Sequence, residues 1–383
     1  MPSFLSNLRH VLFGTPYQQY QIEDPVAFTN DPLAWSRPLA NMDMEDKSQV
    51  EVGTDALFVG IYDGHKGNTV SIYLREQIFR ELIRRIQANN NNMNKNILRQ
   101  VVTRMDRDFL ETAGRNFFVS SGCLICLIWR GTLYAANVGD SRAVLGSLKG
   151  IGQLKRLAVK QIVKDHNIDR RDVQVEVRAL QPVLADIDYY INYRTFLYMD
   201  QKGLINTTRC IGYKYLKEEI NESEVSDWER VPGRFTRPLL TSEPHVYSRN
   251  LKDSDKFIIF GSSGFWRVMP NKDAAYVVNT SPRDGIAERL VTLAIQEGAK
   301  LRRRRYSQLI GLPKSNHISG EDIRYHNYRQ FRPAYHDDIT VIVVYLDQRP
   351  NREGVMLEMN SYRGCDDGSQ QSEFTNFYNN ANV

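Results

Sequence analysis

The amino-acid sequence predicts an α+β fold in which antiparallel β-sheets pack together and helices flank them. Short apolar runs that end at turn residues, such as residues 56–62 and 256–260, have the length of strands. Two longer segments, residues 69–86 and 97–113, repeat apolar side chains at helical spacing. Runs of strands are interrupted by paired helices, whereas a doubly wound parallel sheet would alternate strand and helix strictly.

The first predicted strand follows a lead-in, residues 1–40, that contains no long periodic pattern. This strand covers residues 56–62 and ends in Asp63-Gly64-His65. Asn68 is a suitable N-cap for the helix after the turn, because its side chain can accept backbone N–H groups of the first helical turn. The apolar stripe of that helix consists of Leu74, Ile78, Leu82 and Ile86.

Strands dominate the middle of the chain, with apolar segments at residues 122–129, 133–137 and 143–146. Asn137-Val-Gly-Asp-Ser141 supplies the turn between the last two. A short helix is predicted for residues 173–180. Residues 181–240 are predicted to form loops and short strands.

The last third of the chain contains two more predicted strands with a helix between them. The run from Lys256 to Phe260 predicts a strand that ends at Ser263-Gly264. Ser281-Pro282-Arg283-Asp284 is similar to a capping box with proline at the first helical position, and it predicts a helix start. His336-Asp337-Asp338 leads into the final core strand, residues 339–346. Residues 349–383 are rich in Asn, Ser, Gly and Asp and are predicted to be a disordered tail.

The composition argues against several classes of protein. The 383 residues are 42% hydrophobic and 25% charged, which is ordinary for a soluble globular protein. A net charge of +5, mixed along the chain, argues against an obligate nucleic-acid-binding protein. The N-terminus lacks the apolar core of a signal peptide, and the longest apolar runs are too short to span a membrane. We therefore expect a cytoplasmic and/or nuclear protein without a transmembrane segment.

The cysteines give no sign of a disulfide framework. Cys123, Cys126, Cys210 and Cys365 are few for this chain length. Cys123 and Cys126 form a CxxC pair inside a predicted strand, where residues three apart point to opposite faces. This pair is therefore not expected to bind a metal or to act as a redox couple.

A basic run, Arg302 to Arg305, follows a predicted helix. The simplest interpretation is a solvated helix end. A targeting role, or an interaction with an anionic surface, is the alternative.

Acidic residues occur where predicted strands meet turns. They are Glu45 and Asp46 before a strand, Asp63 after one, Asp140 in a turn, and Asp337 and Asp338 before the last strand. Carboxylates that converged at a sheet edge would repel one another unless cations lay between them, and oxygen ligands select hard ions such as Mg²⁺ or Mn²⁺. Two such ions can activate a water and stabilise charge on a phosphoryl group. For any single aspartate, ordinary turn chemistry is the competing interpretation.

Six motifs follow one another in a fixed order over roughly residues 40–348. They are Phe58-Val-Gly-Ile-Tyr-Asp63-Gly64-His65, Ala136-Asn-Val-Gly-Asp140-Ser-Arg142-Ala-Val144, Lys164-Asp-His-Asn167, Thr241-Ser-Glu-Pro244, Ser263-Gly264-Phe265-Trp266 and His336-Asp337-Asp338-Ile-Thr-Val341. Each is weak alone, but together they resemble the type 2C metal-dependent serine/threonine protein phosphatase family. Met44 to Glu51 and Trp129 to Leu133 are similar to the plant branch of that family.

The resemblance implies a four-layer α-β-β-α sandwich over residues 41–348, with two central antiparallel sheets flanked by helix pairs. It also implies hydrolysis of phosphoserine and phosphothreonine in phosphorylated proteins, with two Mg²⁺ or Mn²⁺ ions as cofactors. A monomer is expected, with a regulatory protein as a further partner. Residues 181–235 and 306–335 are the loops expected to select substrates and partners.

The resemblance also implies which residues bind the metal ions. Asp63 is expected to bridge both ions, with Gly64 binding one of them through its backbone carbonyl. Asp337 is expected to bind the other ion. Glu45 and Asp46 match residues that hold metal-bound waters.

Two further residues complete the expected active site. Asp140 matches an acidic residue near the metals. His65 matches the residue proposed as general acid, which donates a proton to the leaving serine or threonine oxygen. Without the resemblance, His65 would be interpreted as an ordinary turn histidine.

Five residues depart from the family pattern. Ser263 replaces an aspartate that binds metal directly, and a hydroxyl is a poorer ligand for Mg²⁺ than a carboxylate. Arg267 and Tyr213 stand where acidic residues are usual, and Arg267 would repel a nearby metal. Lys66 replaces a glycine, which predicts strain if the turn needs a positive φ. Asn41 stands where many relatives place a phosphate-binding arginine.

These departures leave three hypotheses open. The first is an active but impaired phosphatase in which one of the two ions is weakly bound or absent. The second is a catalytically inactive relative that binds phosphoproteins or regulators. The third is a different metal-dependent phosphohydrolase on the same fold, which would prefer a small metabolite to a phosphopeptide.

Overall fold

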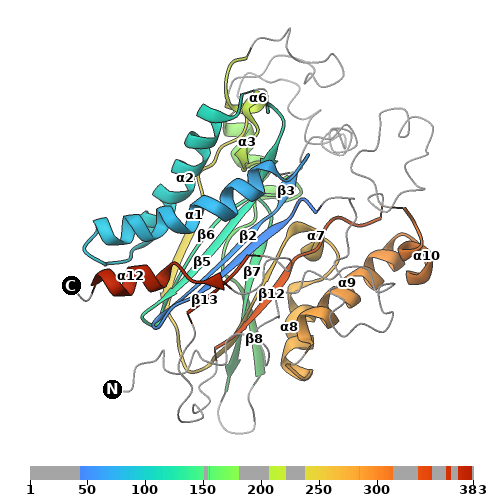
Figure 1. Ribbon diagram of the computed structural model, residues 1–383. Coiled ribbons are helices and arrows are strands. Elements are labelled where there is room, and N and C mark those ends of the chain that lie inside the picture. Colours follow the sequence, from blue (N-terminus) through green and yellow to red (C-terminus); the bar gives the residue numbers. More distant parts are fainter. Residues whose placement is uncertain are drawn as a thin grey trace.

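Two antiparallel β-sheets form the centre of the computed structural model, which describes residues 44–114, 116–150, 154, 156–180, 207–220, 238–283, 285–313, 335–346, 359–363 and 370–381 (Figure 1). The larger sheet has the strand order β10-β6-β5-β2-β1-β13-β14. Its strands are β10 (His245–Asn250), β6 (Thr132–Val138), β5 (Cys123–Trp129), β2 (Ala56–Tyr62), β1 (Lys47–Val52), β13 (Asn360–Tyr362) and β14 (Gln370–Gln371).

The smaller sheet has the strand order β12-β11-β7-β8. Its strands are β12 (Val341–Tyr345), β11 (Asp255–Gly261), β7 (Arg142–Lys149) and β8 (Arg156–Gln161). Gly261 pairs with Arg142 on one side and with Val341 on the other. This register places three chain segments at the same end of the strands, namely residues 140–141, 262–263 and 337–340.

A third, short sheet lies beyond the ends of β2 and β5 of the larger sheet. It has the order β3-β4-β9, formed by β3 (Gly64–His65), β4 (Ser120–Ser121) and β9 (Ile211–Gly212). β3 follows β2 after a single residue, Asp63. The strand end that carries Asp63 is therefore fixed by sheet pairing on both sides.

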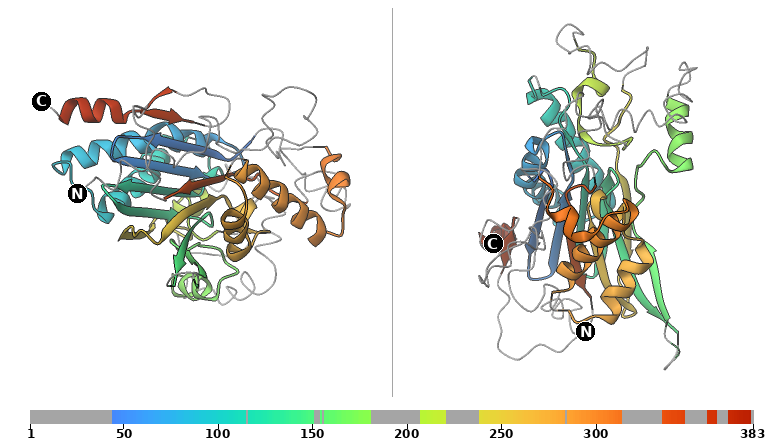
Figure 2. Two further views of the ribbon diagram at one scale, coloured as in Figure 1. Left: turned by 90° about the horizontal axis from the view of Figure 1, so that it is seen from below. Right: turned by 90° about the vertical axis from the view of Figure 1, so that its right-hand side faces the viewer.

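Helices cover the two sheets (Figure 2). α1 (Thr69–Ala88) and α2 (Lys95–Thr112) pack on the larger sheet, whereas α8 (Asn271–Thr280) and α9 (Ile286–Leu301) pack on the smaller one. α2 begins after Asn94, whose side-chain oxygen accepts hydrogen bonds from the backbone N–H groups of Asn96 and Ile97. The remaining described helices are α3 (Arg171–Leu180), α6 (Lys214–Lys217), α7 (Ser263–Trp266), α10 (Tyr306–Ile310) and α12 (Phe374–Ala381).

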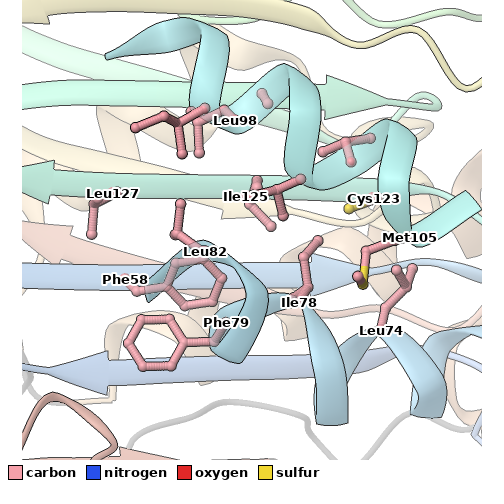
Figure 3. Packing of buried hydrophobic residues seen from close by; sticks show 14 of the residues in the cluster. Phe58, Leu74, Ile78, Phe79, Leu82, Leu98, Met105, Cys123, Ile125 and Leu127 are labelled. Carbon is pink, nitrogen blue, oxygen red and sulfur yellow. The ribbon is translucent and has the colours of Figure 1, made fainter. Parts of the chain in front are cut away.

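Three hydrophobic clusters connect these elements. The first joins α1 and α2 to the larger sheet, and Figure 3 shows Leu82 packing beside Phe58 within it. The second contains residues of both sheets, such as Ile61 and Ile258. The third joins the smaller sheet to α8 and α9 and includes Leu290. The α+β class with antiparallel sheets is therefore confirmed.

The CxxC pair has the geometry that the sequence predicts. Cys123 and Cys126 are both buried in β5. Cys123 belongs to the cluster under α1 and α2, whereas Cys126 belongs to the cluster that both sheets share. The two thiols therefore point to opposite faces of the sheet.

The C-terminal segment contains regular structure, in contrast to the disordered tail predicted for residues 349–383. β13 pairs antiparallel with β1, and α12 lies alongside α1 (Figure 2). Phe374 is fully buried, with its ring centroid 4.9 Å from that of Phe79 and 6.5 Å from that of Trp129. The asparagine-rich composition concealed this apolar stripe, which consists of Phe374, Phe377 and Tyr378.

Other differences concern element boundaries. The helix predicted to begin at Ser281-Pro282 begins at Ile286, because Gly285 has a φ of 66° and interrupts the helical path. The helix α8 and the strands β8 and β10 were also not predicted from the sequence. Residues 1–40, Asn41 and most of the expected loops at 181–235 and 306–335 lie outside the described residues. Within the described segments, no helix has both the length and the apolar character that crossing a membrane requires.

Candidate metal-dependent active site

Asp63 lies at the end of β2, where the edges of the two sheets meet. Its side chain is buried, and its Oδ2 accepts a hydrogen bond from the backbone N–H of Ser263 at 2.7 Å. The hydroxyl of Ser141 donates to the same oxygen at 3.3 Å. Ser263 begins α7 and Ser141 directly precedes β7, so this carboxylate joins the larger sheet to two segments of the smaller one.

Two glycines allow the backbone segments of the site to touch. A Cβ atom on Gly64 would lie 2.4 Å from the carbonyl oxygen of Glu45, and one on Gly264 would lie 2.1 Å from the carbonyl oxygen of Asp338. Both distances are shorter than van der Waals contact, so a larger residue fits at neither position. The backbone N–H of Glu45 also donates to Asp338 Oδ2 at 2.9 Å. These contacts bring four segments together: 45–46, 63–64, 263–264 and 337–338.

Two carboxyl groups of these segments, those of Glu45 and Asp46, have a raised pKa. Burial raises the pKa of Glu45 to about 8, and the negative charges of Asp337 and Asp338 add to the effect. Burial, followed by the charge of Asp63, raises the pKa of Asp46 well above its usual value. A cation among these groups would relieve their repulsion and favour the ionised forms.

Asp140 belongs to the same electrostatic cluster. Burial raises its pKa, and the charge of Asp63 raises it further, whereas the positive charges of Arg267 and His65 act in the opposite direction. Its Oδ2 accepts a hydrogen bond from Asn167 Nδ2 at 2.9 Å. This bond connects the Lys164 to Asn167 motif to the site.

Ser263, at the position where the sequence departs most from the family, has an unsatisfied hydroxyl. The residue is 4% exposed, and its Oγ has no hydrogen-bond partner among the described residues. Burying a hydroxyl without a partner costs about 1–3 kcal/mol. Because the N–H of the same residue donates to Asp63, this oxygen belongs to the immediate surroundings of the carboxylate.

Arg267 places a positive charge in the cluster. Its Nη1 lies 3.4 Å from Asp337 Oδ2, and the two side chains are 44% and 39% exposed. It is also the largest influence that lowers the pKa of Asp140. The guanidinium therefore neutralises part of the negative charge that would otherwise attract a metal ion.

His65 and Lys66 form the turn after Asp63. The Nε2 of His65 lies 3.9 Å from Asp63 Oδ1, while its Nδ1 is buried without a hydrogen-bond partner in the described part of the chain. Lys66 has a φ of 60°, so this turn has the left-handed conformation that a glycine, the usual residue of the family at this position, would adopt most easily. For a residue other than glycine this conformation costs about 1–2 kcal/mol.

The structure places Tyr213 in a separate environment. Tyr213 is fully buried in a hydrophobic cluster with Phe117 and Leu240, beside the short strand β9. Its position therefore supplies apolar packing under the short sheet.

Sequence reasoning did not single out Ser141 and Thr340. Ser141 donates to Asp63, and Thr340 donates to Asp46 Oδ2 at 2.9 Å. Both lie inside recognised motifs, next to the acidic residues that drew attention.

The donor set fits a hard divalent cation in part. The oxygens of Asp63, Asp337, Glu45 and Asp46 are ligands of the type that Mg²⁺ and Mn²⁺ prefer. The raised pKa values of Glu45 and Asp46 indicate unbalanced negative charge around them. In the part of the chain that the structure describes, however, no three acidic, histidine or cysteine side chains already converge closely enough to hold an ion. Ser263 adds no charge to this donor set, and Arg267 adds a positive charge beside Asp337.

Residues 40–302 match the model of the protein phosphatase 2C family. The chain belongs to this family. It is 34% identical over 347 residues to probable protein phosphatase 2C 43 of Oryza sativa subsp. japonica, covering 85% of this chain and 84% of the relative. It is 36% identical over 342 residues to probable protein phosphatase 2C 68 of Arabidopsis thaliana, covering 83% and 82%. These matches support the predicted place among the plant type 2C metal-dependent serine/threonine phosphatases.

Solved structures agree on the fold. A serine-threonine phosphatase 2C from Toxoplasma gondii has a TM-score of 0.53 and 14% identity, covering 80% of this chain and 92% of its own. A C. elegans sex-determining protein has a TM-score of 0.51 and 15% identity, covering 82% of this chain and 63% of its own. At these identities the likeness concerns the fold alone.

Proposed function

We propose that this protein hydrolyses phosphoserine and phosphothreonine in other proteins at the carboxylate site around Asp63. The observation that carries the proposal is that backbone contacts bring together segments that carry acidic residues from distant parts of the sequence. Glu45 and Asp338 are 293 positions apart, yet the backbone of one donates to the carboxylate of the other. We further propose that residues 41–348 as a whole form the four-layer α-β-β-α arrangement.

We infer that Asp63, the carbonyl of Gly64 and Asp337 hold divalent cations, with Glu45 and Asp46 orienting ion-bound waters. When bound, Mg²⁺ or Mn²⁺ would activate a water and neutralise the charge that builds on the phosphoryl oxygens. The raised pKa values of Glu45 and Asp46 support this inference, since a cation would stabilise the ionised forms of both carboxyl groups.

Two ions are expected to differ in affinity. Ser263 offers a neutral oxygen where a carboxylate would add a full negative charge, and Arg267 already pairs with Asp337 at 3.4 Å. Changes in the outer coordination shell alone commonly cost about 10–100-fold in metal affinity or activity. We therefore propose one ion of ordinary affinity and one that binds weakly.

His65 is proposed to act as the proton donor. In the reaction, an oxygen from water forms a bond to phosphorus while the bond to the serine or threonine oxygen breaks, and the leaving oxygen takes up a proton. His65 lies in the turn beside Asp63, with its Nε2 3.9 Å from Asp63 Oδ1 and its side chain partly exposed. It can therefore reach both the site and an incoming phosphoester.

A catalytically inactive, phosphoprotein-binding protein is the second candidate. Two observations favour it: the buried, unpartnered hydroxyl of Ser263 and the ion pair between Arg267 and Asp337. Such a protein would keep the fold and bind its partner without turnover.

The two candidates are separated by a phosphopeptide assay in Mn²⁺. We expect slow release of phosphate by the wild type and loss of that activity in Asp63→Asn, with Glu111→Gln, at an exposed carboxylate of α2, as the control. Wild-type activity that is absent, while a phosphopeptide still binds, would favour the inactive candidate. Preference for a small phosphometabolite over phosphopeptides would point to a different phosphohydrolase.

A further inference from the structure

The chain carries a cationic surface that the catalytic site does not use. Four consecutive arginines, Arg302 to Arg305, follow the end of α9, and all four side chains are exposed. No carboxylate among the described residues forms an ion pair with Arg302, Arg303 or Arg305. Four like charges in succession repel one another, so a negatively charged ligand would be stabilised here.

This basic run is connected to the segment that carries Asp337. The Nη2 of Arg304 donates to the Tyr335 hydroxyl at 3.2 Å, and its guanidinium lies 5.6 Å from the centre of that ring. Tyr335 is buried and precedes Asp337 by two residues, which the chain spans in at most about 7 Å. With the length of the Tyr335 side chain added, the guanidinium of Arg304 lies within about 15 Å of Asp337, a distance that about five residues of extended peptide span.

A groove lies between α9 and the segment that carries Arg267. It has a volume of about 560 Å³, and its lining includes Arg267, Met269, Val277, Leu293 and Leu301. Arg267 pairs with Asp337 at the catalytic site, while Leu301 directly precedes the basic run and is 69% exposed. The groove therefore borders both the site and the arginines.

Two acidic residues line the groove, and neither forms an ion pair with Arg302 to Arg305. Glu297 pairs with Lys300 at 2.5 Å, which leaves the four arginines unaffected. Asp273 also lines the groove, on α8. The charge and the apolar lining together suit a peptide with an apolar residue and several carboxylates.

We propose that this groove and Arg302 to Arg305 bind the sequence that flanks the phosphorylated residue, and that the enzyme therefore selects phosphoproteins with acidic residues near the phosphorylation site. The proposal rests on the proposed phosphatase function and specifies its substrate class. Arginine suits this role because its planar guanidinium binds a carboxylate or a second phosphate through paired hydrogen bonds. The contact between the run and Tyr335, two residues before Asp337, favours a substrate segment over a membrane surface.

The test measures binding separately from turnover. Two fluorescent peptides carry the same phosphothreonine analogue with a non-hydrolysable phosphonate, one flanked on both sides by aspartates and the other by asparagines. We expect the wild type in Mn²⁺ to bind the acidic peptide about tenfold more tightly, since several exposed charge pairs each contribute modestly. In Arg302→Gln/Arg303→Gln this ratio should fall to near one.

The matched control is Lys149→Gln/Arg156→Gln. These two exposed cations are paired residues of β7 and β8. They lie at one end of the hairpin, whereas Arg142, next to the site, lies at the other end of β7. The control should keep the wild-type ratio. Thermal unfolding of both variants shows whether each is folded.

Several outcomes would overturn the docking proposal. They are equal binding of the two peptides by the wild type, or a ratio that survives in the Arg302/Arg303 variant. Binding to phosphatidylserine vesicles that the variant loses, with a peptide ratio near one, would instead assign the run to a membrane surface. Hydrolysis of p-nitrophenyl phosphate, which has no flanking sequence, tests the phosphatase proposal separately. If the protein does not hydrolyse this compound, the ratio of the two peptide affinities can still be measured.

Discussion

The backbone N–H of Ser263 donates to Asp63 Oδ2 at 2.7 Å, although the two residues are 200 positions apart. The donor is the main chain, so this bond forms whatever side chain occupies position 263. The architecture of the site is therefore kept in a chain that has replaced one of its expected metal ligands. A side chain of the site can therefore be replaced without removing this backbone contact.

Ser263→Asp should strengthen metal binding and raise phosphopeptide hydrolysis. A carboxylate at this position replaces an unpartnered buried hydroxyl beside Asp63. We expect Mn²⁺ affinity to rise by at least about tenfold. Without metal the same change should lower the free energy of unfolding by about 1–3 kcal/mol, because it adds a further negative charge to a buried acidic cluster. Ser263→Asn adds comparable bulk without charge and is the control, and equal gains in both variants would argue against a ligand role.

Removing the charge of Arg267 should favour the second ion. Arg267→Gln deletes the ion pair with Asp337, which is more than a third exposed on both sides and so contributes less than about 1 kcal/mol to stability. The double variant Ser263→Asp/Arg267→Asp should bind more Mn²⁺ per protein than Ser263→Asp alone, as measured by calorimetry. A loss of metal binding on changing Arg267 would mean instead that this side chain holds Asp337 in position.

The metal-free protein should lose stability as the pH rises from about 4.5 to about 8. The Glu45 carboxyl has a pKa of about 8 when folded, mainly because it is buried, whereas its ordinary value is 4.5. Between these values the unfolded chain binds fewer protons than the folded one, so the free energy of unfolding falls as pH increases, by on the order of a few kcal/mol in all.

Urea unfolding in EDTA across this pH range measures the effect. Glu45→Gln should flatten the slope, while Glu111→Gln, an exposed carboxylate of α2, should leave it unchanged. Mn²⁺ binding near pH 7 should also release protons, because the ion favours the ionised carboxylates. A slope that is the same in wild type and Glu45→Gln would contradict the assignment.

The C-terminal helix should contribute strongly to stability. Phe374 is fully buried against Phe79 and Trp129, so Phe374→Ala should cost about 3–5 kcal/mol in the free energy of unfolding. Asn376→Ala, on the exposed face of the same helix, should change it by less than about 0.5 kcal/mol. Chemical denaturation compares the two, and similar values for both would restore the original expectation of a disordered tail.

Strongly periodic segments could be predicted from the sequence, whereas weakly patterned ones could not. The stripe of Leu74, Ile78 and Leu82 identified α1, because a continuous apolar face is a local signal. β8 and β10 mix polar and apolar side chains on partly exposed strands, and only their pairing with β7 and β6 reveals them. Phe374 and Phe377 were hidden by neighbouring asparagines.

The site was predictable in its composition but not in its contacts. The family resemblance pointed to Asp63, Asp337 and Glu45, which the structure does bring together electrostatically. That Arg267 pairs with Asp337, and that the hydroxyl of Ser263 is left unsatisfied, depends on side-chain positions that arise only when distant segments meet. No local pattern encodes such contacts.

Calorimetric titration of Mn²⁺ into the wild type and into Asp63→Asn, at neutral pH, tests the central claim most directly. The claim is that carboxylates brought together by the fold hold the divalent cation at Asp63. The account predicts saturable binding by the wild type and a loss of at least about tenfold in affinity on removing one charge from the central carboxylate. Equal binding isotherms for the two proteins would contradict it.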